Sequence, residues 1–379
     1  MSYLNEFVKN FEVQWVVLGK VAQLKRGKTI TKKNKKDGDI PVISGGQKPA
    51  YYNADYNRDG ETITVAGSGA YAGHVMYWNE KIFVSDAFSV IPEPSKLVLR
   101  YVYHLLLNKQ SWIYKLQKGV GVPHVYPKDL AKLEIPIPCP DNPERSIKIQ
   151  KEIVRVLDTF TKLTEGLNAE LTTELTARKK QYEYYREQLL TFDENIGFDS
   201  LENLAENLNS KRKPIASGLR ESGDIPYYGA SGIVDYVKNY IFDGDYLLIS
   251  EDGANLLARK TPIAFSISGK SWVNNHAHIL KFETYVERRF VEYYLNSIDL
   301  TPYISGAAQP KLNKRNLNSI KIPDPSFNDK QRIVDILDKF DVLTTSISEG
   351  LPKEIELRQK QYEYYRNKLL TFPKDTVEV

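Results

Sequence analysis

The sequence predicts an α+β protein with two homologous halves, each a mixed α/β globular domain followed by a long helix. Three observations indicate this fold: the chain contains an internal repeat, the best-matched part of each repeat has helical periodicity, and the rest alternates short β-branched runs with Gly, Pro and Asn. We expect the two long helices to join the globular domains and to pack antiparallel as an intramolecular coiled coil with pseudo-two-fold symmetry.

The composition of the 379-residue chain is typical of a folded protein with two or three domains, since 41% of its residues are hydrophobic and 26% are charged. Cys139 is the one cysteine, which excludes an intramolecular disulfide framework and multi-cysteine metal sites. The first fifteen residues contain scattered charges, and no apolar run reaches about 18 residues. We therefore expect a cytoplasmic protein without a signal peptide or a transmembrane helix.

The internal repeat is clearest in the segment Lys-Gln-Tyr-Glu-Tyr-Tyr-Arg, which occurs at 180–186 and at 360–366. Residues 151–192 align with 331–372 without gaps, with 21 identities in 42 positions, and the preceding portions align more weakly. The repeat predicts four segments. These are a first globular domain at 1–146, a helical region at 147–194, a second globular domain at 195–328 and a second helical region at 329–373.

Each helical region has apolar residues every three or four positions, which predicts a continuous packing seam of a coiled coil. Forty such residues predict a helix of roughly 60 Å. A stutter near Leu171 and Leu351 is expected to unwind the supercoil, and Gly350 and Pro352 predict a kink or restart of the second helix. The predicted seam consists of Ile153, Phe160, Leu163, Leu167, Leu171, Tyr182, Tyr185, Leu189, Ile333, Phe340, Leu343, Leu351, Ile355, Tyr362, Tyr365 and Leu369.

Tyr184 and Tyr364 lie one residue off this seam, at equivalent positions of the two repeats. An exposed aromatic residue kept in both copies is a candidate anchor for another protein. The alternative is that each tyrosine packs under its own globular domain.

Two variable globular domains, each followed by a nearly identical helix, resemble the specificity subunits of type I restriction-modification systems. The resemblance covers essentially the whole chain and includes a proline-rich exit from each globular domain, at 135–138 and 322–325. It also includes the Ile-Val-x-x-Leu-Asp segment at 153–158 and 333–338.

The resemblance implies a non-catalytic DNA-binding subunit whose two target-recognition domains each recognise half of a bipartite, asymmetric DNA target. It implies that the helices fix the spacing and dock two modification (methyltransferase) subunits. ATP-dependent restriction subunits, which translocate and cleave DNA, would join in the full complex. No cofactor is expected in this chain, because S-adenosylmethionine would belong to the modification subunits. Two alternatives remain: a coiled-coil adaptor whose globular domains bind protein, and a degenerate enzyme.

Motifs that suggest catalysis lack their required context. The Gly-x-Gly-x-x-Ala segment at 67–72 is followed by a strand-like run, whereas a dinucleotide loop opens a helix. The Gly-Lys-Thr and Gly-Lys-Ser segments at 27–29 and 269–271 have Ala22 and Ala264 where a P-loop needs its first glycine. The five histidines show no pattern of metal ligands, so we predict neither a metal site nor a catalytic centre.

A basic run in the first repeat falls opposite a shorter basic run in the second, which predicts contact with the DNA backbone over the alternative of a solvated loop. Polar and aromatic residues nearby are candidates for contacts to base edges. The predicted DNA-binding residues are Lys25, Arg26, Lys28, Lys32, Lys33, Lys35, Lys36, Gln47 and Tyr51 in the first repeat, and Lys211, Arg212, Lys213 and Tyr236 in the second.

Overall fold

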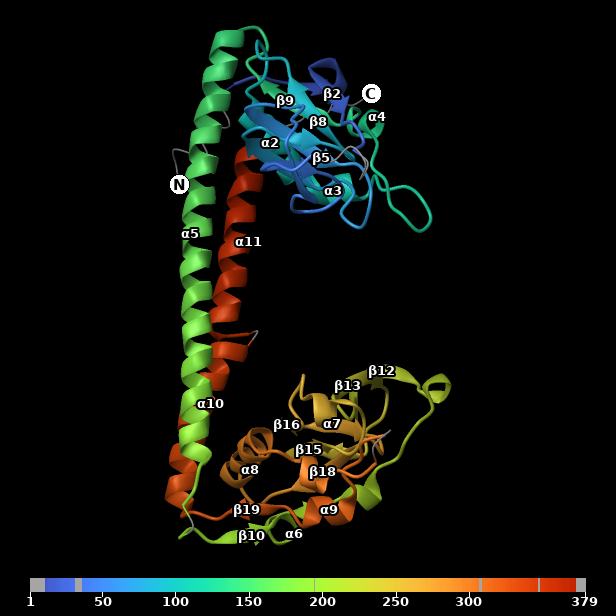
Figure 1. Ribbon diagram of the computed structural model, residues 1–379, viewed down its shortest axis with the longest axis vertical. Helices are drawn as coiled ribbons and strands as arrows, with labels where there is room; N and C mark the ends of the chain where they lie inside the picture. The colour runs from blue at the N-terminus through green and yellow to red at the C-terminus, as the bar shows by residue number, and fades with distance from the viewer. Residues whose placement is uncertain (1–10, 31–35, 194, 307–308, 347, 373–379) are drawn as a thin grey trace. The chain divides into compact units, whose positions relative to one another are not determined.

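The computed structural model describes residues 11–30, 36–193, 195–306, 309–346 and 348–372 (Figure 1). The chain divides into two compact units: unit 1 contains residues 1–170 and 355–379, and unit 2 contains residues 171–354. Within the described ranges, none of the helices combines the length and the apolar character that crossing a membrane requires.

Unit 1 contains a four-stranded antiparallel sheet of order β2-β8-β5-β6, a three-stranded sheet of order β4-β3-β7 and a β1-β9 pair. In the three-stranded sheet β3 pairs with β7 in parallel. Its elements are β1 (Val13–Val17), η1 (Leu18–Lys20), β2 (Ala22–Arg26), β3 (Ile40–Ile43), β4 (Tyr51–Asn53), β5 (Glu61–Ala66), β6 (Val75–Asn79), β7 (Phe83–Val84), β8 (Ala87–Pro92), α2 (Leu99–Asn108), α3 (Gln110–Tyr114), α4 (Pro127–Leu130) and β9 (Glu134–Pro138).

Unit 2 contains the sheets β11-β18-β15-β16 and β13-β12-β17-β14 and a β10-β19 pair. Its elements are β10 (Phe198–Ser200), α6 (Leu201–Leu204), β11 (Glu206–Asn207), η3 (Asn209–Lys211), η4 (Ser217–Leu219), β12 (Ser222–Gly229), β13 (Gly232–Val237), β14 (Phe242–Asp243), β15 (Tyr246–Ser250), α7 (Asn255–Ala258), β16 (Ala264–Ile267), β17 (Lys270–Val273), β18 (Ala277–Lys281), α8 (Tyr285–Ser297), η5 (Thr301–Tyr303), α9 (Lys314–Asn318) and β19 (Lys321–Pro323).

The strand orders of the two units correspond strand for strand, apart from the additional β14 in unit 2. The parallel pair β3-β7 has its counterpart in the parallel pair β12-β17, within otherwise antiparallel sheets. The α+β class and the duplication are therefore confirmed, and the duplication extends through the portion in which the sequence identity is weak.

The long helices differ between the repeats. The first repeat has one continuous helix, α5 (Pro143–Leu190), whereas the second has α10 (Phe327–Thr345) and α11 (Gly350–Leu370). Gly350 adopts a φ of +76°, and a Cβ there would lie 2.4 Å from the Val342 carbonyl oxygen. The restart predicted at Gly350 is confirmed. The first repeat continues through this point because Glu170 and Thr172 occupy the positions of Gly350 and Pro352.

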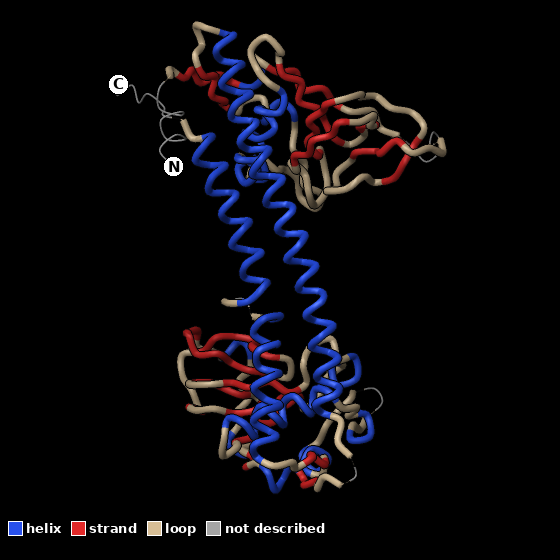
Figure 2. Tube along the Cα trace, turned by 90° about the vertical axis from the view of Figure 1, so that its left-hand side faces the viewer, coloured by secondary structure: helices blue, strands red, loops and turns tan. Residues whose placement is uncertain are grey.

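The hydrophobic core of unit 1 combines the sheet and α2 with the start of α5 and the end of α11. Ile153 and Leu157 of α5 and Leu369 of α11 are buried in the same cluster as Tyr101 and Leu105 of α2. Figures 1 and 2 show α11 beside the first part of α5. Each unit is thus closed by the start of its own long helix and the end of the helix from the other repeat, because unit 2 has the equivalent arrangement of α8, α10 and the end of α5.

Equivalent aromatic pairs hold the helices together in both units. In unit 1 Phe160 of α5 stacks on Tyr365 of α11 with ring centroids 5.6 Å apart. In unit 2 Tyr185 of α5 stacks on Phe340 of α10, also at 5.6 Å. Phe160 and Phe340 are equivalent in the repeat, as are Tyr185 and Tyr365, so the antiparallel pairing repeats the same contact with the two helices exchanged.

The structure does not bury Leu163 and Leu167 in the predicted seam, because their side chains are 57% and 42% exposed. The stripe that continues from the buried Leu157 at helical spacing instead passes through Thr161, Thr164, Asn168 and Leu171, which are partly buried. Thr161 Oγ1 lies 2.9 Å from the Tyr362 hydroxyl oxygen. The apolar pattern therefore failed here because polar side chains face the partner helix and leucines lie beside them.

Asp158 attaches the globular part of unit 1 to α5. Its Oδ1 accepts hydrogen bonds from Arg100 Nε at 3.0 Å and from His104 Nε2 at 2.7 Å, both on α2. The equivalent Asp338 in unit 2 accepts from Arg289 Nε at 2.9 Å and from the Tyr293 hydroxyl at 2.7 Å. The two contacts differ in that only the one in unit 1 contains a histidine, whose ordinary pKa is about 6.5.

His104 is fully buried, and its Nδ1 has no hydrogen-bond partner among the described residues. Burial lowers the pKa of His104 below its ordinary value, while the hydrogen bond to Asp158 opposes this shift. The folded chain therefore binds the proton less readily than the unfolded chain. Stability is fully present above the unfolded pKa of about 6.5 and falls as the pH decreases below it.

We expect His104→Gln to reduce the loss of thermal stability between pH 7.5 and pH 5.5, because glutamine can still donate to Asp158 but does not titrate. The measurement is the unfolding midpoint of the full chain at both pH values. Part of the pH dependence will persist, since burial also lowers the pKa of His74 and of His278. An unchanged pH dependence would show that His104 does not contribute to it.

Candidate nucleic-acid interface

The predicted basic run of unit 1 begins at the end of β2. Lys25, Arg26 and Lys28 are exposed, and the Arg26 guanidinium lies 6.0 Å from the centroid of the Tyr126 ring. Lys36 is exposed and pairs with a neighbouring carboxylate. The remaining predicted residues, Lys32, Lys33 and Lys35, lie outside the described residues.

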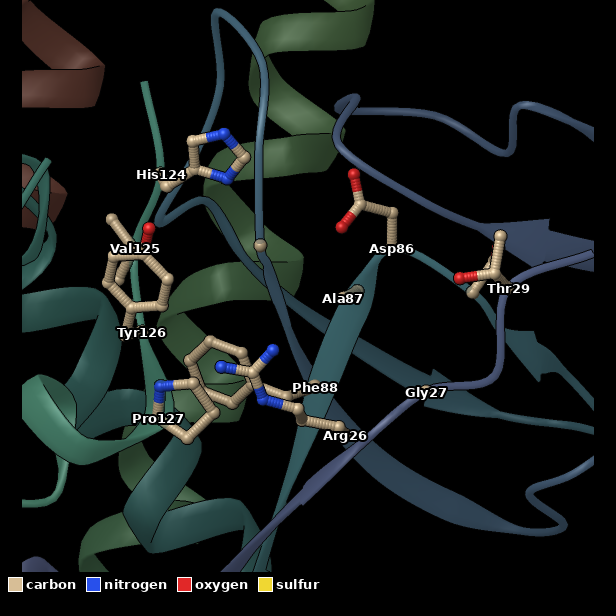
Figure 3. Close-up of a pocket in the computed structure, with 12 residues that line it drawn as sticks. Arg26, Gly27, Thr29, Asp86, Ala87, Phe88, His124, Val125, Tyr126 and Pro127 are labelled. Atoms are coloured by element: carbon tan, nitrogen blue, oxygen red, sulfur yellow. The ribbon is translucent and has the colours of Figure 1, made fainter. Parts of the chain in front are cut away.

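Arg26 borders a pocket of about 130 Å³ between β2, the β5–β6 turn and the segment before α4 (Figure 3). Its polar lining includes Arg26, Asp86 and His124, which come from three separate segments. Ser68 Oγ donates a hydrogen bond to the Asp86 carboxylate, and the His124 ring stacks on Tyr126 with a 14° angle between the rings. The pocket therefore presents a cation, a carboxylate and a flat aromatic face, a set of groups that can donate to, accept from and stack on a base.

Sequence analysis did not identify Asp86, His124 or Tyr126 as candidates. The available signal was the Gly-x-x-x-Pro segment at 119–123, which recurs at 306–310 immediately before His124 and Lys311. Of the other predicted residues, Gln47 is exposed in a loop whose Gly45 approaches Ser68, and Tyr51 is partly buried on β4. Neither residue lines the pocket.

Unit 2 fills the equivalent place with an internal ion pair. Arg212 Nη1 lies 2.7 Å from Glu251 Oε2 and 2.6 Å from the Ala277 carbonyl oxygen, and its side chain is only 12% exposed. Lys311 Nζ lies 3.2 Å from Glu251 Oε1. Burial alone would raise the pKa of Glu251, but the hydrogen bond from Arg212 and the neighbouring charges hold it below its usual value.

Arg212 therefore makes internal contacts, and its predicted contact with DNA stays a prediction. The guanidinium donates to Glu251 and to the backbone carbonyls of Asn209 and Ala277, all inside unit 2. The neighbouring Lys211 and Lys213 are exposed, and Tyr236 on β13 is 51% exposed. These three remain candidates.

Backbone hydrogen bonds show that Gly67 and Glu251 are equivalent. Gly67 N donates to the Asp86 carbonyl at 3.1 Å, and Glu251 N donates to the His276 carbonyl at 2.9 Å, each between matched strands. A glycine leaves the pocket of unit 1 open, whereas the glutamate and Arg212 occupy the same place in unit 2. The same backbone arrangement therefore carries an open pocket in unit 1 and an ion pair in unit 2.

Tyr184 and Tyr364, the candidate partner anchors, are each 60% exposed. Their rings meet the edges of Tyr185 and Tyr365 at 5.5 and 5.4 Å. By contrast, Tyr362 is buried against α5. Tyr182 is partly buried near Phe340, and this burial raises the pKa of its hydroxyl.

The described residues contain no group of three or more His, Cys, Asp or Glu side chains that could hold a metal ion.

Comparisons with known proteins agree over the length of the chain. The model of the type I restriction modification DNA specificity domain matches residues 10–177 and again residues 195–357. The chain is 33% identical to the EcoR124I/EcoR124II specificity subunit of Escherichia coli, a type I restriction enzyme subunit, over 99% of this chain and 98% of that one. It is 32% identical to a putative type I restriction enzyme specificity subunit of Haemophilus influenzae, over 98% of both chains.

Two solved structures share the fold. The S subunit of a type I restriction-modification system from M. genitalium has a TM-score of 0.54 and 21% identity, over 97% of this chain and 98% of that chain. A chain from a structure of complex assembly and conformational transition in the type I R-M system has a TM-score of 0.60 and 14% identity, over 96% of this chain and 98% of that chain.

We expect Arg212→Gln to lower the free energy of unfolding by about 3 kcal/mol, because it leaves the buried Glu251 carboxylate with one cationic partner fewer. Arg26→Gln is the control, since Arg26 is exposed and its loss should change stability by less than about 0.5 kcal/mol. Urea unfolding can be followed by tryptophan fluorescence. Trp272 donates a hydrogen bond to the carbonyl of Lys213, next to Arg212, so its surroundings change when unit 2 unfolds. Equal stability of the two variants would contradict the internal role of Arg212.

Proposed function

Because the chain belongs to the type I restriction-modification DNA specificity family, we propose that it recognises a bipartite, asymmetric DNA target, one half with each unit. The supporting observation is that the two units share one strand order but differ in the chemistry of the equivalent pocket, which is open beside Gly67 and filled beside Glu251. Under this proposal residues 1–146 and 195–328 are the target-recognition domains, and 147–194 and 329–373 are the helical regions that set the spacing.

The proposed role is recognition without catalysis. Two modification subunits would dock on the helical regions and methylate the DNA with their own S-adenosylmethionine, and restriction subunits would complete the enzyme. The E. coli and H. influenzae relatives are named as specificity subunits, which supports this division of labour. The chain would act in the cytoplasm, where its DNA and partner subunits are found.

The experiment that tests this function is the mapping of methylated adenines in DNA exposed to the chain together with its modification subunit. We expect methylation at one interrupted sequence whose two halves are unlike, because the two pockets differ. A coiled-coil adaptor that binds only protein would produce no dependence on DNA sequence. Two identical halves in opposite orientation would contradict separate recognition by the two units.

Replacing Lys25, Arg26, Lys28, Lys32, Lys33, Lys35 and Lys36 by glutamine should weaken binding to all DNA sequences alike. Each lost phosphate contact should reduce the slope of log affinity against log salt concentration by about 0.9. The measurement is a salt titration of binding to target and unrelated duplexes. Lys151→Gln, at an exposed position of α5, is the control. A slope that does not change would mean that the basic run is only solvated.

Replacing Tyr184 and Tyr364 by alanine should weaken association with the modification subunit and leave the unfolding midpoint of the chain nearly unchanged, since both rings are exposed. Replacing Tyr182 and Tyr362 should instead destabilise the chain by about 3–5 kcal/mol per ring where the ring is fully buried, and by less at Tyr182. Association is measured by titration calorimetry. If both pairs destabilise the chain equally, the exposed tyrosines are structural.

A further inference from the structure

A short hairpin in unit 1, residues 118–124, is fixed at its base. Lys118 N donates to the His124 carbonyl at 2.9 Å, and His124 N donates to the Lys118 carbonyl at 2.8 Å. Gly69 N donates to the Pro123 carbonyl at 3.0 Å, which ties the hairpin to the turn after β5. The base is therefore held by the backbone on both sides and borders the pocket through His124.

The tip of this hairpin is apolar and projects into solvent. Val120 is fully exposed and Val122 is 54% exposed. Gly119 and Gly121 flank Val120 with φ values of +113° and +93°, which favour glycine. A single exposed valine is common on protein surfaces. The charged groups at the base of the same hairpin are what indicate a ligand.

Three cations and two carboxylates lie at the base of the hairpin. Lys118 Nζ pairs with Asp129 Oδ2 at 2.8 Å. The side chains of Lys128 and Arg26 lie 5.9 and 6.0 Å from the centroid of the Tyr126 ring. An apolar tip above a positively charged base matches a nucleic acid, whose phosphates are outermost and whose bases lie within a groove.

Unit 2 has the equivalent backbone hydrogen bonds but a different sequence between them. Ser305 N donates to the Lys311 carbonyl and Lys311 N to the Ser305 carbonyl, both at 2.8 Å, and Gly253 N donates to the Pro310 carbonyl at 3.1 Å. The three residues between glycine and proline are Val-Gly-Val in the first repeat and Ala-Ala-Gln in the second. A constant frame with a variable tip is what two copies that recognise different bases require.

We propose that the tip of the 118–124 hairpin enters the major groove and that Val120 recognises the 5-methyl group of a thymine. This inference rests on the proposed function, since it assigns a residue and a base to DNA recognition. The major groove admits a two-stranded ribbon, and the thymine methyl is the apolar feature of a base edge there. Lys128 and Arg26 contact the flanking phosphates.

The test uses the full chain with its modification subunit and a duplex that contains the mapped target. Each thymine of the target is replaced in turn by deoxyuridine, which lacks only the methyl group. We expect one replacement to weaken binding about fourfold, the effect of one buried methyl group. Val120→Ala should bind the thymine and deoxyuridine duplexes equally at that position. Val342→Ala, an exposed valine on α10, is the matched control and should retain the fourfold ratio.

Four results would overturn the inference while leaving the proposed function intact. Binding could be specific but insensitive to every deoxyuridine, or Val120→Ala could keep the fourfold ratio. Val120→Ala could also weaken binding to both duplexes equally and change the stacking of a 2-aminopurine probe, which would indicate insertion between bases in the minor groove. A target without thymine counts against the inference as well. Binding without any sequence preference would instead refute the proposed function.

Discussion

The hydrophobic core of each unit includes the end of the long helix from the other repeat, and the rest of the structure depends on this exchange. Leu369 and Leu370 of the second repeat are buried in unit 1, and Leu190 of the first repeat is buried in unit 2. Within each unit the start of one helix and the end of the other pack into the same core, so the two helices run antiparallel there. The stacked pairs Phe160–Tyr365 and Tyr185–Phe340 repeat the same contact with the helices exchanged.

Hydrogen bonds to Asp158 and Asp338 fix how the neighbouring helices α2 and α8 are oriented in this packing. Apolar contacts alone tolerate rotation of a helix about its axis, whereas a carboxylate that accepts from an arginine and from a residue one turn further fixes the angle of α2 or α8. A globular part held in this way has a defined orientation to its own helix. That requirement is shared by both repeats, which is the physical reason for the aspartate in each copy.

The globular parts differ from the helices, because they share a backbone arrangement but carry different side chains on it. The backbone bonds of Gly67 and Glu251 are equivalent, yet one position leaves a pocket open and the other closes it with Arg212. A buried ion pair stabilises little by itself, but it makes the surface of unit 2 unlike that of unit 1. Differences of this kind change the surface chemistry of one unit without changing the fold that supports it.

The duplication, the mixed α+β units, the long helices and the break at Gly350 could all be predicted from the amino-acid sequence, and the resemblance indicated the family. These follow from local properties, since periodicity, glycine and proline act within a few residues, and a repeat is visible without any contact. Which side chains contact one another became known only from the packed fold. Thr161 contacts the partner helix, whereas Leu163 is exposed. Arg212 pairs with Glu251. Asp86 and His124 line one pocket. Such contacts join residues far apart in the chain, and hydrophobicity and charge along the sequence do not encode which of several neighbours a side chain will face.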